Sequence, residues 1–229
     1  MEPRELALPL TRGQLDIWLS QESGLAATEW QLGLLVRANG PVLRDVLRQA
    51  IRQVVYEAEP GRVAFTEIGG SIVQRPIDYP DVGLDFYDLI ESEDPARNVR
   101  RLATAIQHAP MPLTGPLFKF ALFQTRVDEL YLFGCCHHIA MDGLGMALVC
   151  RRIATIYSAL VAGEEVPPAY FGSLRDLVEL ETAYAASGDF QDDQTYWGRH
   201  LPPESGLDPW RRKAAIDRDA HAPSAPIRF

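Results

Sequence analysis

Two adjacent histidines, His137 and His138, are the residues of this chain best suited to chemistry. They follow the apolar run Leu130–Cys136 and are followed in turn by Asp142 and Gly143. An imidazole, with an unperturbed pKa near about 6.5, can accept a proton at neutral pH. Asp is a common first residue of helices, and the backbone N–H of a glycine there can be closely approached by developing negative charge. This group of residues therefore predicts proton transfer, or stabilisation of developing negative charge, at one turn of the chain.

The elements around this turn are predicted to be a buried strand and a core helix. Leu130–Cys136 is almost wholly apolar and lacks helical spacing, which indicates a strand buried on both faces. After Gly143, apolar residues recur every three or four positions as far as Leu160, which predicts a helix packed on a core. Successive side chains of a strand point to opposite faces, so only one histidine can face a given cavity.

Two other interpretations of the cluster need to be weighed. A histidine pair after a buried strand can be one core residue and one surface residue. The side chains of Cys135, Cys136, His137, His138 and Asp142 are also all possible metal ligands. Four consecutive strand residues alternate between two sides, however, and cannot converge on one ion. We therefore expect no metal site, and we expect both cysteines to be small buried residues rather than a disulfide or a nucleophile.

Composition limits the classes of function. The chain has 229 residues, of which 47% are hydrophobic and 23% charged, as is ordinary for a globular protein with one core. Its net charge of −9 argues against nucleic acid as a partner. We expect no apolar segment of membrane-spanning length and find no signal sequence at the N-terminus. These features predict a cytoplasmic protein without a membrane partner.

The residues from His137 to Gly143 match a known pattern. The sequence His-His-Ile-Ala-Met-Asp-Gly resembles the His-His-x-x-x-Asp-Gly signature of condensation domains in nonribosomal peptide synthetases, which are similar in fold to chloramphenicol acetyltransferase. Other segments also resemble this family in part: Thr11–Trp18 with a capping-box Thr and Gln, Ala58–Arg62, Leu84–Asp88, Met111–Leu117 and Tyr196–Pro202. In Ala58–Arg62 only Glu59 and Arg62 match, and we expect Arg62 to be an ordinary surface charge.

The alternation of strands and helices predicts an α/β fold, a two-layer sandwich with a mixed sheet covered by helices. The resemblance adds that this fold is chloramphenicol-acetyltransferase-like and is one lobe of a two-lobed domain. We expect residues 1–201 to form the N-terminal lobe. The Pro-rich residues 202–229 are expected to be a loop or partly disordered tail leading to the second lobe, to which nothing in the chain corresponds.

The resemblance also implies a reaction, in which the amine of a downstream carrier-bound amino acid attacks an upstream carrier-bound acyl thioester. His138 matches the active-site position, either as a general base or as a group that positions the amine. Asp142 would be structural and pair with an arginine. We expect the N–H of Gly143 to be an oxyanion donor or a site of close approach, and His137 to be structural. Gly145 stands where the family often has serine.

The implied partners are upstream and downstream peptidyl carrier proteins, whose phosphopantetheine carries the substrates, and the missing C-terminal lobe. No cofactor is expected on this chain. Because half of the domain is missing, we expect the chain to be inactive alone and to self-associate or bind the other lobe. Its start, almost at the first motif, would also suit a domain that accepts a starter acyl group. The alternatives are a CoA- or carrier-dependent O- or N-acyltransferase and a non-catalytic lobe that docks carrier proteins.

Overall fold

The structure, a computed structural model, describes residues 7–22, 27–78 and 83–201. The chain divides into two compact units, one ending at Glu181 and the other beginning at Thr182. The expected tail, residues 202–229, lies outside the described residues, so its conformation stays a prediction.

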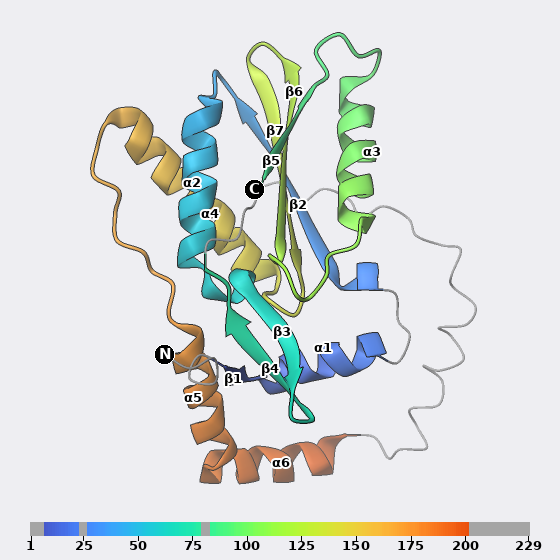
Figure 1. The fold of residues 1–229 in the computed structure, drawn as a ribbon, viewed down its shortest axis with the longest axis vertical. Helices are drawn as coiled ribbons and strands as arrows, with labels where there is room; N and C mark the ends of the chain where they lie inside the picture. Colours follow the sequence, from blue (N-terminus) through green and yellow to red (C-terminus); the bar gives the residue numbers. More distant parts are fainter. Residues whose placement is uncertain (1–6, 23–26, 79–82, 202–229) are drawn as a thin grey trace, which may run out of the picture. The chain divides into compact units, whose positions relative to one another are not determined.

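The elements alternate along the chain much as the sequence predicts (Figure 1). Within the first unit they are β1 (Leu8–Pro9), α1 (Arg12–Glu22), the 3-10 helix η1 (Ala27–Trp30), β2 (Gln31–Asn39), α2 (Arg44–Glu57), the 3-10 helix η2 (Glu59–Arg62), β3 (Val63–Ile68), β4 (Ser71–Pro76), β5 (Leu84–Asp88), α3 (Pro95–His108), β6 (Phe118–Arg126), β7 (Glu129–His137) and α4 (Gly143–Ala162). Helix α5 (Leu174–Ala185) crosses the boundary, and α6 (Gly188–His200) lies in the second unit.

The strands form two sheets. The larger one has the order β2-β7-β6-β5, in which β5 runs parallel to β6 and the other pairs are antiparallel. The smaller one has the order β1-β4-β3 and is antiparallel throughout. The predicted α/β fold with a mixed sheet is therefore confirmed. In the larger sheet Gln31 of β2 is paired with His137 at the end of β7, which fixes the place of the histidine pair at one end of the sheet.

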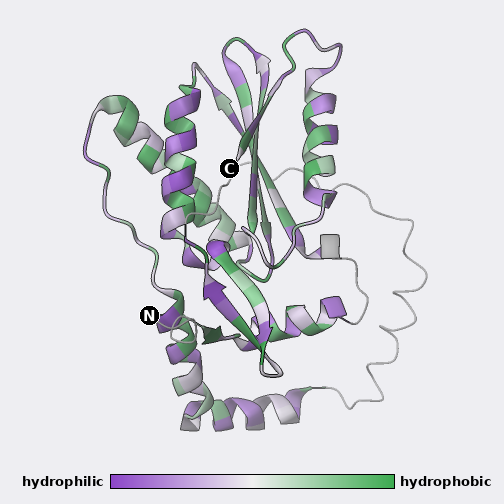
Figure 2. Ribbon diagram, viewed as in Figure 1, coloured by the Kyte–Doolittle hydropathy of each residue, from purple (hydrophilic) through white to green (hydrophobic). Residues whose placement is uncertain are grey.

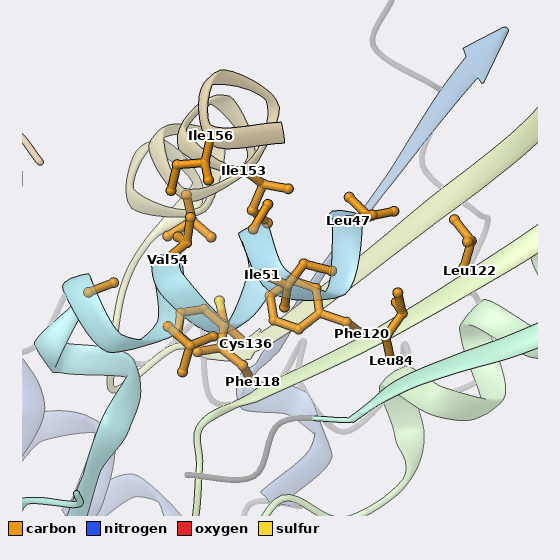
Figure 3. Packing of buried hydrophobic residues seen from close by; sticks show 14 of the residues in the cluster. Leu47, Ile51, Val54, Leu84, Phe118, Phe120, Leu122, Cys136, Ile153 and Ile156 are labelled. Atoms are coloured by element: carbon orange, nitrogen blue, oxygen red, sulfur yellow. The ribbon is translucent and has the colours of Figure 1, made fainter. Parts of the chain in front are cut away.

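Helices cover both faces of the larger sheet: α2 and α4 lie on one side, and α3 lies on the other (Figure 1). In Figure 2 both α2 and α3 carry hydrophobic and hydrophilic residues in alternation, as expected for helices that cover a sheet. The core cluster on the first side joins residues such as Ile51, Val54 and Ile153 of the helices to Phe118 and Phe120 of β6 (Figure 3). A second cluster occupies the other side of the sheet.

The cysteines are small buried residues, as predicted. Cys136 belongs to the core cluster shared with α2 and α4, and its neighbour Cys135 belongs to the opposite cluster, because side chains alternate along β7. Both are fully buried and free, and burial raises the pKa of the Cys135 thiol to about 11 and that of Cys136 to about 12. Thiols of this kind are poor nucleophiles at neutral pH.

Helix α4 corrects one expectation. Its 20 residues include a window with a mean hydropathy of 1.5, so by length and composition it could cross a membrane, and the expectation that no segment is apolar enough was wrong. The apolar side chains have a place in the fold: Met146, Val149 and Ile153 are buried in the cluster between α4, α2 and the sheet. Core helices of globular proteins pass the same test.

The position of Arg62 also differs from the expectation. It is a buried residue, 9% exposed, and not an ordinary surface charge. Its guanidinium donates hydrogen bonds to the carbonyl oxygens of Tyr56 at 2.9 Å and Ile77 at 3.1 Å, and lies 3.8 Å from Glu59. Arginine has enough donors to satisfy several carbonyls at once, which makes its burial tolerable.

A second buried arginine joins the two helices on one face of the sheet. The guanidinium of Arg152 in α4 donates to both carboxylate oxygens of Glu57 in α2, at 2.7 and 2.9 Å. The exposed fractions of the two side chains are only 2% and 12%. Burial alone would raise the pKa of Glu57, but the hydrogen bonds from Arg152 and Gln53 outweigh it and hold that pKa below its ordinary value. Glu57 is therefore ionised, and the pair fixes α4 against α2.

This pair generates a prediction about stability. Arg152→Met leaves the carboxylate of Glu57 buried without its partner, so we expect a loss of about 3–5 kcal/mol in the free energy of unfolding, measured by urea denaturation. The double variant Arg152→Met, Glu57→Leu removes both charges and should recover most of that loss. Arg48→Met is the control, because its partner Asp45 is 95% exposed and the pair should contribute about 1 kcal/mol or less. An Arg152→Met loss no larger than that of the control would show that Glu57 does not depend on Arg152 for its stability in the fold.

Candidate functional site

The predicted site is a short turn between the end of β7 at His137 and the start of α4 at Gly143. Asp142 is the N-cap of α4, as predicted, and its Oδ1 accepts a hydrogen bond of 2.8 Å from the N–H of Gly145. The N–H of Ala140 donates to the carbonyl of His137 at 2.9 Å, which closes the turn. These two bonds hold the backbone that carries the histidines.

His137 is fully buried, and both of its ring nitrogens have partners. Nδ1 accepts a hydrogen bond of 3.1 Å from the N–H of Ile139, which requires the neutral ring with its proton on Nε2. Nε2 lies 2.7 Å from the amide nitrogen of Gln21 in α1. Because Nε2 of the ring carries the proton in this tautomer, the contact is a hydrogen bond when the Gln21 amide is turned so that its oxygen accepts. Burial lowers the pKa of His137 to about 4, with smaller contributions from His138 and Lys119. The ring is thus a neutral connection between α1 and the turn.

His138 has the opposite environment. It is exposed, and its ring forms no hydrogen bond with any described residue. Its backbone N–H donates to the carbonyl of Trp30 at 2.6 Å, and its imidazole meets the indole of Trp30 edge to face, with 6.3 Å between the ring centroids. The expectation that only one histidine is available to a cavity is consistent with this arrangement: His137 is occupied and His138 is free.

Asp142 differs from the pattern that the resemblance implies. Its carboxylate is exposed and caps α4, but none of the ion pairs found within the described ranges joins it to an arginine. The buried arginines are used elsewhere, since Arg62 contacts two carbonyls and Glu59 while Arg152 contacts Glu57. In this chain the N-cap bond is therefore the contact that holds Asp142.

Two glycines shape the start of α4 in different ways. A Cβ added to Gly143 would meet no atom within 4 Å, so the space beside the α-carbon of this residue is open. A Cβ added to Gly145 would lie 2.9 Å from the Cβ of Met141, closer than carbon atoms tolerate. The serine that the family often has at this position therefore does not fit here unless the turn moves.

The metal alternative finds no support in the part of the chain that the structure describes, where no group of three or more His, Cys, Asp or Glu side chains could hold an ion. The reason is the one given by the strand geometry: Cys135 and Cys136 lie on opposite sides of the sheet, and the nitrogens of His137 are occupied. That the protein needs no metal stays a prediction.

Two residues that contact the histidines were not foreseen from the sequence. Gln21 reaches His137 from the last turn of α1, 116 positions away in the chain. Trp30 lies beside His138 because β2 and β7 pair in the register that sets Gln31 opposite His137. Neither residue carries a local signal of this contact, which depends on pairing between distant segments.

The buried neutral ring of His137 predicts a pH dependence of stability. Its pKa is about 4 in the fold, against an ordinary 6.5, so between these values the unfolded chain binds a proton that the folded chain excludes. Stability is fully present above about pH 6.5 and is lost as the pH falls toward 4. In urea denaturation, the stability of wild type relative to His137→Asn should fall by roughly 2–3 kcal/mol from pH 7 to 4.5, because asparagine does not titrate.

The control for this measurement is His108→Asn, since His108 is exposed and bonds through Nδ1 to the carbonyl of Thr104. Its profile should run parallel to that of wild type. A parallel profile for His137→Asn as well would show that the His137 ring is not buried in its neutral form.

Known proteins are similar to this chain in sequence. The family model described as Condensation domain matches residues 5–207. The dimodular nonribosomal peptide synthase of Bacillus subtilis (strain 168) is 32% identical over 197 residues, which are 86% of this chain and 8% of that protein. Enterobactin synthase component F of Escherichia coli O157:H7 is 29% identical over 208 residues, 88% of this chain and 16% of that protein.

Solved structures agree. The starter condensation domain of rhizomide synthetase is similar with a TM-score of 0.78 at 30% identity, over 86% of this chain and 48% of that one. The first condensation domain of the calcium-dependent antibiotic synthetase has a TM-score of 0.78 at 31% identity, over 83% of this chain and 46% of that one. The chain thus spans just under half the length of these solved chains, and it belongs to the condensation domain family.

Proposed function

We propose that this chain is the N-terminal half of a condensation domain that forms amide bonds in nonribosomal peptide synthesis. The observation that carries the proposal is the free, exposed imidazole of His138 on the turn between β7 and α4, in a chain of this family. The donor is an acyl or aminoacyl thioester on an upstream carrier protein. The acceptor is the amine of an amino acid on a downstream carrier protein.

The chemistry requires a neutral amine. Its nitrogen attacks the thioester carbonyl, a C–N bond forms, the C–S bond breaks, and the thiol of the donor's phosphopantetheine leaves. The amine must also lose a proton, which the ring of His138 can accept or, through a hydrogen bond, direct. General base catalysis of this kind is typically worth roughly 10²–10⁴-fold in rate, and positioning of the amine adds to it. His137 cannot share this task because both of its nitrogens are occupied.

Gly143 supplies the second group that we assign to the site. The first N–H groups of a helix have no acceptor within the helix, and they favour developing negative charge. Asp142 takes the N–H of Gly145, while the N–H of Gly143 has no acceptor in the described part of the chain. We propose that this N–H stabilises the oxyanion that forms as the amine attacks, and that Asp142 holds the turn in place.

The partners follow from this reaction. A variant of the starter condensation domain of rhizomide synthetase was solved in complex with C8-CoA and Leu-SNAC. By analogy, we expect this chain to take substrates carried as thioesters on phosphopantetheine, with no cofactor or metal of its own, in the cytoplasm. Neither nucleic acid nor a membrane has a part in this reaction.

The site is incomplete in this chain. Leu144 and Leu148, on the first turns of α4 beside the turn, are 70% and 36% exposed. We assign these two side chains to the contact with the other half of the domain. Without it the imidazole of His138 faces water, and nothing encloses the amine and thioester in attack geometry.

The first test of this function compares the two histidines in the complete domain, assayed in single turnovers with loaded carrier proteins. His138→Ala should lower the rate of amide formation by about 10²-fold or more, because it removes the proton acceptor. His137→Asn should retain far more activity in folded material, since the asparagine oxygen can replace Nδ1 as the acceptor for Ile139. Full activity of His138→Ala would remove this residue from the reaction while leaving the fold assignment intact.

The second test concerns this chain alone, which should fold but not form the amide. Adding the other half of the domain should restore the reaction, because the two halves together enclose the reactants. The assay follows amide formation between loaded donor and acceptor carriers, with CoA thioesters and hydroxyl acceptors as further substrates. Turnover by the isolated chain at the rate of the complete domain would contradict the incomplete site. Preference for a CoA donor or a hydroxyl acceptor would favour an O- or N-acyltransferase. If the two halves together bind carrier proteins but form no product, the chain would instead be a docking lobe.

A further inference from the structure

Trp30 is bound to the backbone of the candidate catalytic histidine. It ends η1 directly before β2, and its carbonyl accepts a hydrogen bond of 2.6 Å from the N–H of His138. This bond extends the ladder of β2 and β7 by one residue beyond the pairing of Gln31 with His137. The two backbones are therefore held opposite each other whatever their side chains do.

The side chains of the two residues also meet. The rings of Trp30 and His138 are perpendicular, with 90° between their planes and 6.3 Å between their centroids, the edge-to-face geometry that aromatic pairs favour. The imidazole has no hydrogen bond to any residue in the described ranges, so no polar partner fixes its orientation. The indole is the aromatic contact that can limit rotation of this ring.

The indole also has a buried hydrogen-bond donor that is unfavourable for folding. Its Nε1 is buried and has no hydrogen-bond partner among the residues that the structure describes. A buried donor without an acceptor is unfavourable for folding, and a phenylalanine would avoid it. The fold of this half alone therefore does not explain a tryptophan at position 30, whereas a large ring placed against the imidazole does account for the size of the side chain.

We propose that Trp30 is a positioning residue, which holds the imidazole of His138 in the orientation needed for proton transfer from the acceptor amine. The inference rests on the proposed function for its catalytic consequence, but the contact itself can be tested without turnover. The carbonyl that accepts the backbone bond is present in every residue type, so a substitution of Trp30 removes the ring contact without removing an atom of that bond.

The first measurement uses NMR of this chain, with the ring protons of His138 assigned from their loss in His138→Ala. In wild type, the current of the indole ring should displace these signals from their free positions. Trp30→Leu should return them toward free values, with Trp30→Met as the substitute if the leucine variant does not fold. Trp30→Phe keeps an aromatic ring and should restore a displacement. Trp18→Leu is the matched control, since Trp18 makes an aromatic contact with Phe65 at the same 6.3 Å.

The second measurement uses the complete domain. Trp30→Leu should lower kcat about two- to tenfold with KM unchanged, because a smaller share of the imidazoles is correctly oriented, and Trp30→Phe should recover most of that loss. Ring signals of His138 that are identical in wild type and Trp30→Leu would overturn the inference, whatever the activities. Full activity of His138→Ala would instead overturn the proposed function and the catalytic consequence of Trp30, while the NMR result would still decide whether the contact exists.

Discussion

The site depends on the alternation of side chains at the end of one strand buried on both faces. Along β7, Phe133 and Cys135 enter one core and Cys136 enters the other, while His137 is buried at the end of the strand. Because the strand ends at His137, the next histidine no longer has a core to enter and is exposed. Two identical side chains thus acquire opposite environments, one buried and neutral, the other exposed.

Much of this arrangement could be predicted, because it is local. The apolar run of β7, the helical spacing after Gly143 and the capping by Asp142 all depend on residues within a few positions of one another. The capping box of α1 is another example: the N–H of Thr11 donates to the side chain of Gln14, and the N–H of Gln14 to the hydroxyl of Thr11. Patterns of this kind are readable from sequence since their partners are fixed by the element itself.

The remainder depends on contacts between distant segments. Glu57 and Arg152 are 95 positions apart, and neither residue differs in its local sequence from an ordinary surface charge. The apolar length of α4 was likewise underestimated, because exposed residues such as Leu144 and Leu148 add to the apolar residues of its buried face. At the site, the partners of both histidines come from α1 and from the residue before β2, and only the folded chain brings them there.

The close approach of position 145 to Met141 has a consequence for how this sequence can change. The obstacle to a side chain at 145 is the Cβ of Met141, which every residue except glycine possesses, so shortening Met141 does not remove it. A hydroxyl could enter only together with a shift of the turn that carries His138 and Asp142. Only a glycine at 141 would remove the obstacle, so the step from glycine to serine at 145 is closed to this chain as a single mutation that leaves the turn where it is.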